Sequence, residues 1–120
     1  MAKFTLVLGA SEKPERYANM AVRRLVAHGH PVIAVGRREG RIGDTAIVMR
    51  IPENTEIDTV TMYLSAANQQ PWRDTLIALR PKRVIFNPGA ENPVLARELD
   101  AMGCEPIEAC TLVMLAAGTY

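Results

Sequence analysis

The sequence has few aromatic residues and almost no net charge. Its 120 residues include one Trp, three Tyr and two Phe, and 14 basic residues nearly balance 13 acidic ones, giving a formal net charge of +1. Nucleic-acid-binding proteins usually present a broad basic face, often with aromatic side chains that stack against bases. We therefore expect no nucleic acid partner, and any recognition of phosphate must come from a few local residues.

Cysteine is also scarce, because Cys104 and Cys110 are the only two. They lack the CxxC spacing of redox and zinc motifs, and no histidine cluster accompanies them. We therefore expect a reduced protein located in the cytoplasm, with no metal site. We interpret Cys104 as a small buried hydrophobe. Cys110 lies nearer the expected ligand site, where it could contact a ligand or react, although we favour packing for both thiols.

No long hydrophobic run is present. The apolar stretch at residues 4–8 ends at a glycine and is soon followed by charged residues. It is far shorter than the roughly 20 residues that a membrane-spanning helix needs. We expect neither a targeting segment nor a membrane partner. With 48% hydrophobic residues and a mass of 13.2 kDa, the chain has the composition of one globular domain over residues 1–120.

The sequence does contain a regular alternation of apolar strands and amphipathic helices. Short runs rich in apolar and β-branched residues predict five strands, at residues 4–8, 32–35, 57–64, 83–87 and 104–108. Apolar residues at helical spacing, with Asn, Pro and Gly at the ends, predict helices at residues 18–28, 68–79 and 93–102, and a short closing helix or apolar tail at 111–118. Residues 36–56 mix glycines and charges, so we expect a loop there with one short strand or turn.

Strands that alternate with helices predict an α/β fold, with a five-stranded, mostly parallel sheet covered by helices on both faces. This is a Rossmann-like three-layer sandwich, for which we expect the strand order 3-2-1-4-5. In such sheets, ligands bind beyond the carboxyl ends of the strands, near the point where the strand order reverses. Small, polar and turn-forming residues follow the first four predicted strands, at Gly9-Ala10-Ser11, Gly36-Arg37-Arg38, residues 63–65 and Asn87-Pro88-Gly89. We therefore expect a small-molecule ligand at this edge.

The loop after the first predicted strand combines a glycine with a hydroxyl and basic side chains. Gly9 permits close approach of a ligand and Ser11 can donate a hydrogen bond. Lys13 or Arg16 can add charge near a helix start, where the helix dipole favours an anion. The loop lacks the GxGxxG fingerprint of dinucleotide-binding proteins, because a serine replaces the second glycine and a proline stands at the third. The same residues are also compatible with an ordinary solvated turn.

The loop after the second predicted strand favours a phosphorylated ribose. A site for NAD usually has an acidic residue there, whereas this chain has Arg37 and Arg38 after Gly36. A guanidinium can make paired hydrogen bonds to phosphate, which favours a nucleotide such as NADP or coenzyme A (CoA). The alternative is that these arginines coat an exposed loop, with Glu39 and Asp44 offsetting their charge.

Three stretches together carry a resemblance to a known family: VLGASEKPERYANMAVRRLVAHGHPVIAVGRREGRIGD at residues 7–44, IDTVTMYL at 57–64 and VIFNPGAENPVLARELDAMGCEPIEACTLVML at 84–115. They resemble the small, free-standing CoA-binding domain proteins, which are similar to the N-terminal nucleotide-binding domain of the succinyl-CoA synthetase alpha subunit. The resemblance covers nearly the whole chain. It implies a domain that binds CoA without ligase activity, because the phosphorylated histidine of the synthetase belongs to a domain that this sequence does not contain.

The resemblance assigns ligand contacts to three loops. It implies that the diphosphate of CoA binds the first loop, at Gly9, Ala10, Ser11, Lys13, Arg16 and Tyr17. The adenosine and its ribose phosphate would lie near Gly36, Arg37 and Arg38, and the pantetheine arm would pass Asn87, Pro88 and Gly89. The chain departs from the common family pattern at two places. Gly36-Arg37 stands where the family often has Asn-Pro, and Leu-Ser-Ala at residues 64–66 stands where it often has an arginine pair.

We interpret the chain as a single-domain module that binds CoA or an acyl-CoA, with no catalytic constellation of its own. Two alternatives stay open. One is an NADP-dependent oxidoreductase or a CoA-linked enzyme that uses Cys110 or Tyr63. The other is a regulatory or scaffold protein that keeps the fold and has lost the ligand. The sequence does not predict a protein partner.

Overall fold

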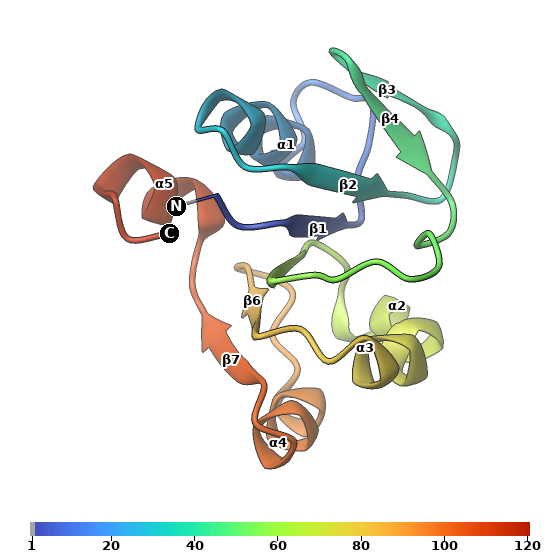
Figure 1. Cartoon of the computed structure of the whole chain (residues 1–120), viewed down its shortest axis with the longest axis vertical. Coiled ribbons are helices and arrows are strands. Elements are labelled where there is room, and N and C mark those ends of the chain that lie inside the picture. The colour runs from blue at the N-terminus through green and yellow to red at the C-terminus, as the bar shows by residue number, and fades with distance from the viewer. Residues whose placement is uncertain (1) are drawn as a thin grey trace.

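The computed structural model describes residues 2–120 and contains one twisted sheet with helices on both sides (Figure 1). The strands are β1 (Thr5–Leu8), β2 (Val32–Val35), β3 (Gly40–Ile42), β4 (Thr45–Val48), β5 (Thr59–Met62), β6 (Arg83–Phe86) and β7 (Glu105–Glu108). The helices are α1 (Tyr17–Ala27), α2 (Ala66–Gln69), the 3-10 turn η1 (Gln70–Trp72), α3 (Arg73–Leu79), α4 (Pro93–Ala101) and α5 (Thr111–Ala117).

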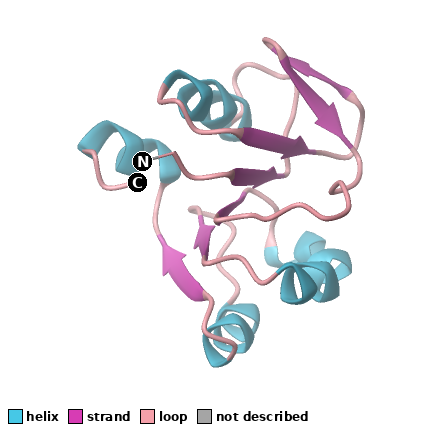
Figure 2. Cartoon of the chain, in the orientation of Figure 1, coloured by secondary structure: helices cyan, strands magenta, loops and turns pink. Residues whose placement is uncertain are grey.

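The sheet has seven strands in the order β3-β4-β2-β1-β5-β6-β7. Every neighbouring pair is parallel except β3 and β4, which form an antiparallel hairpin. Helices α1 and α5 lie on one face, and α2, α3 and α4 lie on the other (Figures 1 and 2). The strand order reverses between β1 and β5, because the chain leaves β1 toward one face and leaves β5 toward the other. The structure thus confirms a Rossmann-like α/β fold with a mostly parallel sheet.

The prediction of five strands is wrong, and so is the place given to residues 57–64 in the strand order. The two additional strands, β3 and β4, come from the segment that was expected to be a loop with one short strand or turn. Ile42 pairs with Thr45, which leaves only Gly43 and Asp44 to make a two-residue hairpin turn. Strand β4 takes the third position, beside β2, so residues 57–64 contribute β5 on the opposite side of β1. Counted by parallel strands alone, the order is the 3-2-1-4-5-6 of doubly wound nucleotide-binding folds.

The sequence signals at helix ends are confirmed at α4 and fail between α2 and α3. The side chain of Asn92 caps α4 by accepting a hydrogen bond from the Leu95 backbone N–H at 3.1 Å, and Pro93 is the first helical residue. The single helix expected at residues 68–79 is instead divided into α2, η1 and α3. Pro71 lies at the break, where it has no N–H to continue the helical hydrogen bonds.

The core forms two layers because the central strands are buried on both faces. All four residues of β1 and of β5 are buried. Leu6 and Leu8 pack under α3 and α4, whereas Val7, which points the opposite way, packs under α1 and α5. This burial on both sides accounts for the continuous apolar run at residues 4–8. None of the helices in residues 2–120 has the length and apolar character required to cross a bilayer.

Candidate functional site

The loops after β1 and β2 touch at the carboxyl edge of the sheet and form one continuous surface. The backbone N–H groups of Gly9 and Ala10 both donate to the Val35 carbonyl, each at 2.9 Å. Gly36 passes so close to this loop that a Cβ there would lie 2.4 Å from the Ala10 carbonyl oxygen. No side chain larger than hydrogen fits that contact without moving backbone. The structure therefore brings together the two loops that the sequence singled out, and Gly36 makes the close approach possible.

The loop after β1 is held in place by contacts on both sides. The side-chain amide of Asn19, in the first turn of α1, donates to the Ser11 carbonyl at 2.9 Å. The Glu12 carboxylate accepts the backbone N–H of Arg41, in β3, at 3.0 Å. The Ser11 hydroxyl accepts the backbone N–H of Lys13 at 3.2 Å, which leaves its own hydrogen free to donate. The loop therefore has a fixed shape, and the Glu12 contact has no local sequence signal because its partner lies 29 residues away.

Four basic side chains of these two loops are exposed and unpaired. Within residues 2–120, no ion pair or side-chain hydrogen bond engages the charged groups of the four predicted site residues Lys13, Arg16, Arg37 and Arg38. Residues 9–17 and 36–41 together contain five basic and three acidic residues, and Glu12 is occupied in the contact with β3. Helix α1 starts beside them without a side-chain cap, so its first N–H groups are open to an anion. Tyr17, the first residue of α1, is 69% exposed.

Asn87 takes a different position from the other predicted site residues. Its side chain is 2% exposed and lies under the edge of the sheet. The amide nitrogen donates to the Thr61 hydroxyl at 2.8 Å and to the Met62 carbonyl at 2.9 Å, and the amide oxygen accepts the Thr111 backbone N–H at 2.9 Å. These bonds join β5, β6 and α5, so the Asn87 side chain shapes the edge from below. Only Pro88 and Gly89 of this predicted loop are exposed.

Tyr63 follows β5 at the point where the strand order reverses. Gly9, at φ +103°, lies against it, and a Cβ on that glycine would come within 3.1 Å of the Tyr63 carbonyl carbon. The Tyr63 hydroxyl is buried and makes no hydrogen bond of normal geometry within residues 2–120. Burial raises the pKa of this hydroxyl to about 12, although the nearby Thr61 and Thr111 side chains favour the charged form. The phenol is therefore neutral near pH 7.

The two cysteines differ in exposure. Cys104 is buried in the larger core cluster, and Cys110, just before α5, is half-buried. Both are free thiols. Across residues 2–120, the structure contains no group of three or more His, Cys, Asp or Glu side chains placed to hold a metal ion.

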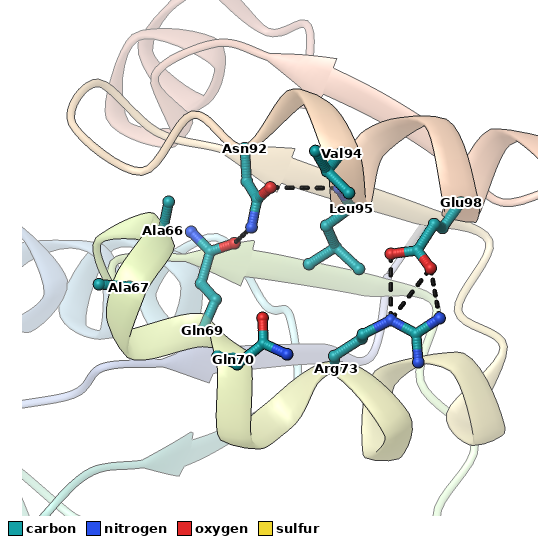
Figure 3. Close-up of a pocket in the computed structure, with 9 residues that line it drawn as sticks. All are labelled: Ala66, Ala67, Gln69, Gln70, Arg73, Asn92, Val94, Leu95 and Glu98. Atoms are coloured by element: carbon teal, nitrogen blue, oxygen red, sulfur yellow. Dashed lines mark hydrogen bonds and ion pairs between the residues drawn. The ribbon is translucent and has the colours of Figure 1, made fainter.

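A groove between α2 and α4 is the feature of this edge that the sequence did not predict (Figure 3). This α2–α4 groove has a volume of about 360 Å³ and includes Ala66, Gln69, Gln70, Asn92, Val94 and Leu95 in its lining. The fully buried Gln69 amide donates to the Leu64 and Ala90 carbonyls at 2.9 and 2.7 Å, and its oxygen accepts from the Asn92 side chain at 2.9 Å. The groove lies on the far side of the reversal point from the basic loops, between helices that follow β5 and β6.

An ion pair between Arg73 of α3 and Glu98 of α4 joins the two walls of the groove away from the sheet edge (Figure 3). Hydrogen bonds from the Arg73 guanidinium hold the pKa of the Glu98 carboxyl below its usual value. Gln69 and Arg73, which line the groove, lie on either side of Pro71, and a sequence interpreted as one helix over 68–79 gives no signal for this groove.

Comparison with known proteins gives the family and the fold. A family model described as CoA binding domain matches residues 3–116. A solved structure of an uncharacterized protein is 46% identical, covers 100% of this chain and 99% of its own, and superposes with a TM-score of 0.96. A hypothetical protein from Pyrococcus horikoshii is 21% identical, with 97% of this chain and 83% of its own covered and a TM-score of 0.86.

A more distant structure has the same fold within a much longer chain. It is a dinucleotide-forming acetyl-coenzyme A synthetase from Candidatus Korarchaeum cryptofilum, 12% identical with a TM-score of 0.73. The match covers 90% of this chain and 26% of the synthetase. A search of curated proteins found no match. The family model spans nearly all of the chain, so this protein belongs to the CoA binding domain family.

Proposed function

We propose that the protein binds CoA, free or acylated, across the carboxyl edge of its sheet. One observation carries this proposal: the two loops at the ends of β1 and β2 form a single surface, through Gly36 and Ala10, and display basic side chains that no carboxylate in residues 2–120 neutralises. Membership of the CoA binding domain family supports the choice of ligand.

The donor groups of the surface fit the phosphates of CoA. CoA carries a diphosphate and a separate phosphate on its ribose. The free hydrogen of Ser11, the open N–H groups of α1 and the charges of Lys13 and Arg16 suit the diphosphate. Arg37 and Arg38, after β2, suit the ribose phosphate, because guanidinium groups bind phosphate with paired hydrogen bonds. The exposed ring of Tyr17 offers an apolar contact beside them.

The pantetheine arm continues from the diphosphate toward β6. It passes over the exposed Pro88 and Gly89, while the buried side chain of Asn87 holds that loop in position. When bound, CoA supplies a thiol or a thioester. The residues of this chain bind and orient that ligand, and the protein acts as a binding module without a reaction of its own.

Isothermal titration with CoA, dephospho-CoA, NADP and NAD tests the proposal. Wild-type protein should bind CoA more tightly than dephospho-CoA, which lacks the ribose phosphate. Arg37→Ala and Arg38→Ala should each weaken CoA binding by about 1–3 kcal/mol, the usual scale for a charged hydrogen bond. Arg24→Ala is the matched control, because it removes an exposed arginine from the last turn of α1, at the other end of the helix.

The relative affinities for the four ligands distinguish the proposed CoA-binding module from the two alternatives. Equal affinity for CoA and dephospho-CoA would refute the role of Arg37 and Arg38. Tighter binding of NADP than of CoA would favour an NADP-dependent oxidoreductase. Absence of binding by any of the four would refute the module and favour a scaffold protein that keeps the fold alone.

A further inference from the structure

We infer that the α2–α4 groove receives the thiol end of the pantetheine arm together with a short acyl group, so that the preferred ligand is a short-chain acyl-CoA. This inference rests on the proposed function, because it needs the nucleotide part of CoA at the loops after β1 and β2. It adds a second subsite on the other side of the reversal point and assigns the acyl group to it.

The α2–α4 groove begins at the carboxyl edge of the sheet, where the proposed path of the pantetheine arm ends. Helices α2 and α4 follow β5 and β6, and their first residues, Ala66 and Asn92–Pro93, stand at the carboxyl edge of the sheet. The loop between β6 and α4 presents Pro88 and Gly89 to solvent at the same edge. An arm that crosses this loop therefore reaches the end of the groove at Ala66 and Asn92, which is opposite the Arg73–Glu98 pair in Figure 3.

The length of the arm matches the separation of the two subsites. Neighbouring strands lie about 4.8 Å apart, so the gap between β5 and β6 lies roughly 7 Å across the sheet from β1. An extended pantetheine arm has about as many backbone bonds as four residues of extended peptide, which span roughly 13 Å. When the diphosphate is bound at the loop after β1, about half of the length of the arm therefore remains to enter the groove between α2 and α4.

The lining of the groove matches the chemistry of the arm, which alternates apolar carbon segments with two amides. The side chains of Ala66, Val94 and Leu95 give the walls an apolar character. Gln69 has both amide hydrogens bound within the protein, whereas Asn92 uses only one of its two in the bond to Gln69. The remaining Asn92 hydrogen can meet a carbonyl oxygen of the arm.

The size and the far end of the groove limit the acyl group. A volume of about 360 Å³ is near the lower end of the range for small-molecule sites. The ion pair between Arg73 and Glu98 joins α3 to α4 at the far end. A long apolar chain that stays in the groove would place carbon against both charges, and one that leaves the groove would lie in solvent. An acyl group of a few carbons ends before the ion pair.

Filling the mouth of the groove tests the inference. In the Ala66→Trp variant, an exposed alanine of the lining becomes a large side chain that occupies the end of the groove at the sheet edge. In the control variant, Ala101→Trp, the same change is made at an exposed alanine at the end of α4, away from the groove. Calorimetric titrations use acetyl-CoA, CoA, palmitoyl-CoA and the head group 3′-phosphoadenosine 5′-diphosphate, which lacks the arm.

We expect Ala66→Trp to weaken binding of CoA and acetyl-CoA at least tenfold and to leave the affinity for the head group unchanged. Ala101→Trp should change none of these affinities. Wild-type protein should bind acetyl-CoA more tightly than CoA, and palmitoyl-CoA no more tightly than CoA. In NMR titrations of wild-type protein, the Asn92 side-chain amide signals should shift with CoA and stay in place with the head group.

The outcomes distinguish this inference from the proposed function. If Ala66→Trp binds CoA and acetyl-CoA as wild-type protein does, the arm lies elsewhere and the groove is not its subsite, while CoA binding itself stands. If palmitoyl-CoA binds far more tightly than acetyl-CoA, the limit to short acyl groups is wrong. If wild-type protein binds neither CoA nor the head group, the proposed function fails and the inference fails with it.

Discussion

The two edges of the sheet use polar residues in opposite ways. At the carboxyl edge, Arg37 and Arg38 extend into solvent without partners in residues 2–120. At the amino edge, Arg83 donates to the Thr59 hydroxyl at 2.7 Å and its guanidinium lies 4.4 Å from the centre of the Tyr120 ring. At the carboxyl edge, Arg37 and Arg38 are thus available to a ligand, whereas at the amino edge Arg83 is in contact with other side chains of the protein.

Tyr120 organises the amino edge. Its hydroxyl shares a hydrogen bond with Thr5, and its backbone oxygen accepts from the Lys3 ammonium. The ring of His30 meets it edge to face, with centroids 4.8 Å apart. These residues come from distant parts of the chain and pack around one aromatic ring, so their interactions add to stability. Arg83 therefore serves the fold, whereas Arg37 and Arg38 make no contact within the described residues that would assign them to it.

The largest effect on stability should come from the network that supports the carboxyl edge from below. Asn87→Ala leaves the Thr111 backbone N–H and the Met62 carbonyl without their side-chain partner. A buried polar group that loses its partner costs about 1–3 kcal/mol, so we expect the free energy of unfolding to fall by about 3 kcal/mol. Urea denaturation followed by circular dichroism measures the change.

The matched control for Asn87 is Asn68→Ala, which removes an exposed asparagine from α2. It should change the unfolding free energy by less than about 0.5 kcal/mol. Equal stability of the two variants would show that the Asn87 side chain contributes little to the fold. It would then favour the original prediction that Asn87 contacts the ligand.

Gly36→Ala should damage both the fold and the site. The added Cβ would lie 2.4 Å from the Ala10 carbonyl oxygen, so the loops after β1 and β2 must separate. We expect a loss of about 2 kcal/mol of stability, within the usual range for overpacking, and a loss of CoA affinity of at least about tenfold, or 1.4 kcal/mol. Chemical denaturation and calorimetric titration measure the two effects.

Gly29→Ala is the control for Gly36→Ala. It shows how much a glycine replacement costs at a position that makes no contact between the two loops. Gly29 has a φ of +81° and open space around its Cβ position, so the substitution should cost about 1 kcal/mol through backbone strain. It should leave CoA affinity unchanged, because Gly29 lies at the opposite end of α1. If the Gly36→Ala variant binds CoA as wild-type protein does, the proposal that the two loops form a single binding surface is wrong.

The sequence predicted the parts of the fold that depend on local signals. Asn92, Pro93 and Gly103 mark the ends of α4 within a few residues, and the apolar run of β1 reflects burial on both faces. The hairpin of β3 and β4 was missed because both strands are short and because β3, Gly40–Ile42, lies in a stretch of glycines and charged residues. Its pairing depends on β2, where Ala34 and Val35 supply the neighbouring strand, and no local pattern reports that neighbour.

The same distinction applies to the site. The position of the loops that follow the strands was predictable, because parallel strands end at one edge of a sheet. Arg37 and Arg38 could be identified from the sequence itself, since they follow a predicted strand. The position of Asn87 was not predictable, since Thr111, whose backbone N–H donates to the Asn87 side-chain oxygen, is 24 residues away. The α2–α4 groove was also hidden, because it depends on how a helix broken at Pro71 packs against another helix.

Two tyrosines allow a direct comparison of the edges. Tyr120→Ala removes the ring beside Arg83 and His30 and the hydrogen bond to Thr5. We expect it to lower the unfolding free energy by about 2 kcal/mol, because the lost contacts are partly buried, and to leave CoA affinity unchanged. Tyr17→Ala removes a ring that is 69% exposed. It should leave stability within about 0.5 kcal/mol of wild type and weaken CoA binding by about 1 kcal/mol.

Unfolding curves and titrations of both tyrosine variants complete this comparison. The expected pattern is a crossed one, with stability lost at the amino edge and affinity lost at the carboxyl edge. If Tyr120→Ala weakens CoA binding as much as Tyr17→Ala does, the two edges are coupled and the division of roles between them is wrong.

The smallest effect should be the pH dependence that His30 gives to the amino edge. Its Nδ1 accepts the Lys3 backbone N–H at 3.0 Å, which requires the neutral ring. Partial burial is the main cause that lowers the pKa of His30 from 6.5, and the positive charges of Lys3, His28 and Arg83 lower it further. Between that lowered pKa and about 6.5, the unfolded chain binds more protons than the folded one, so stability falls as the pH drops through this window.

Urea denaturation at a series of pH values from about 8 to about 5 measures this dependence. His30→Gln removes the titrating ring, so the part of the slope that belongs to His30 should disappear, whereas carboxylates contribute equally to both proteins. His28→Gln removes the exposed imidazole on the other side of Gly29 and, with it, one of the charges that lower the pKa of His30, so it should reduce the slope less than His30→Gln does. An unchanged slope in His30→Gln would mean that the ring protonates without disturbing Lys3 and Tyr120, and that the amino edge tolerates a third cation beside Arg83.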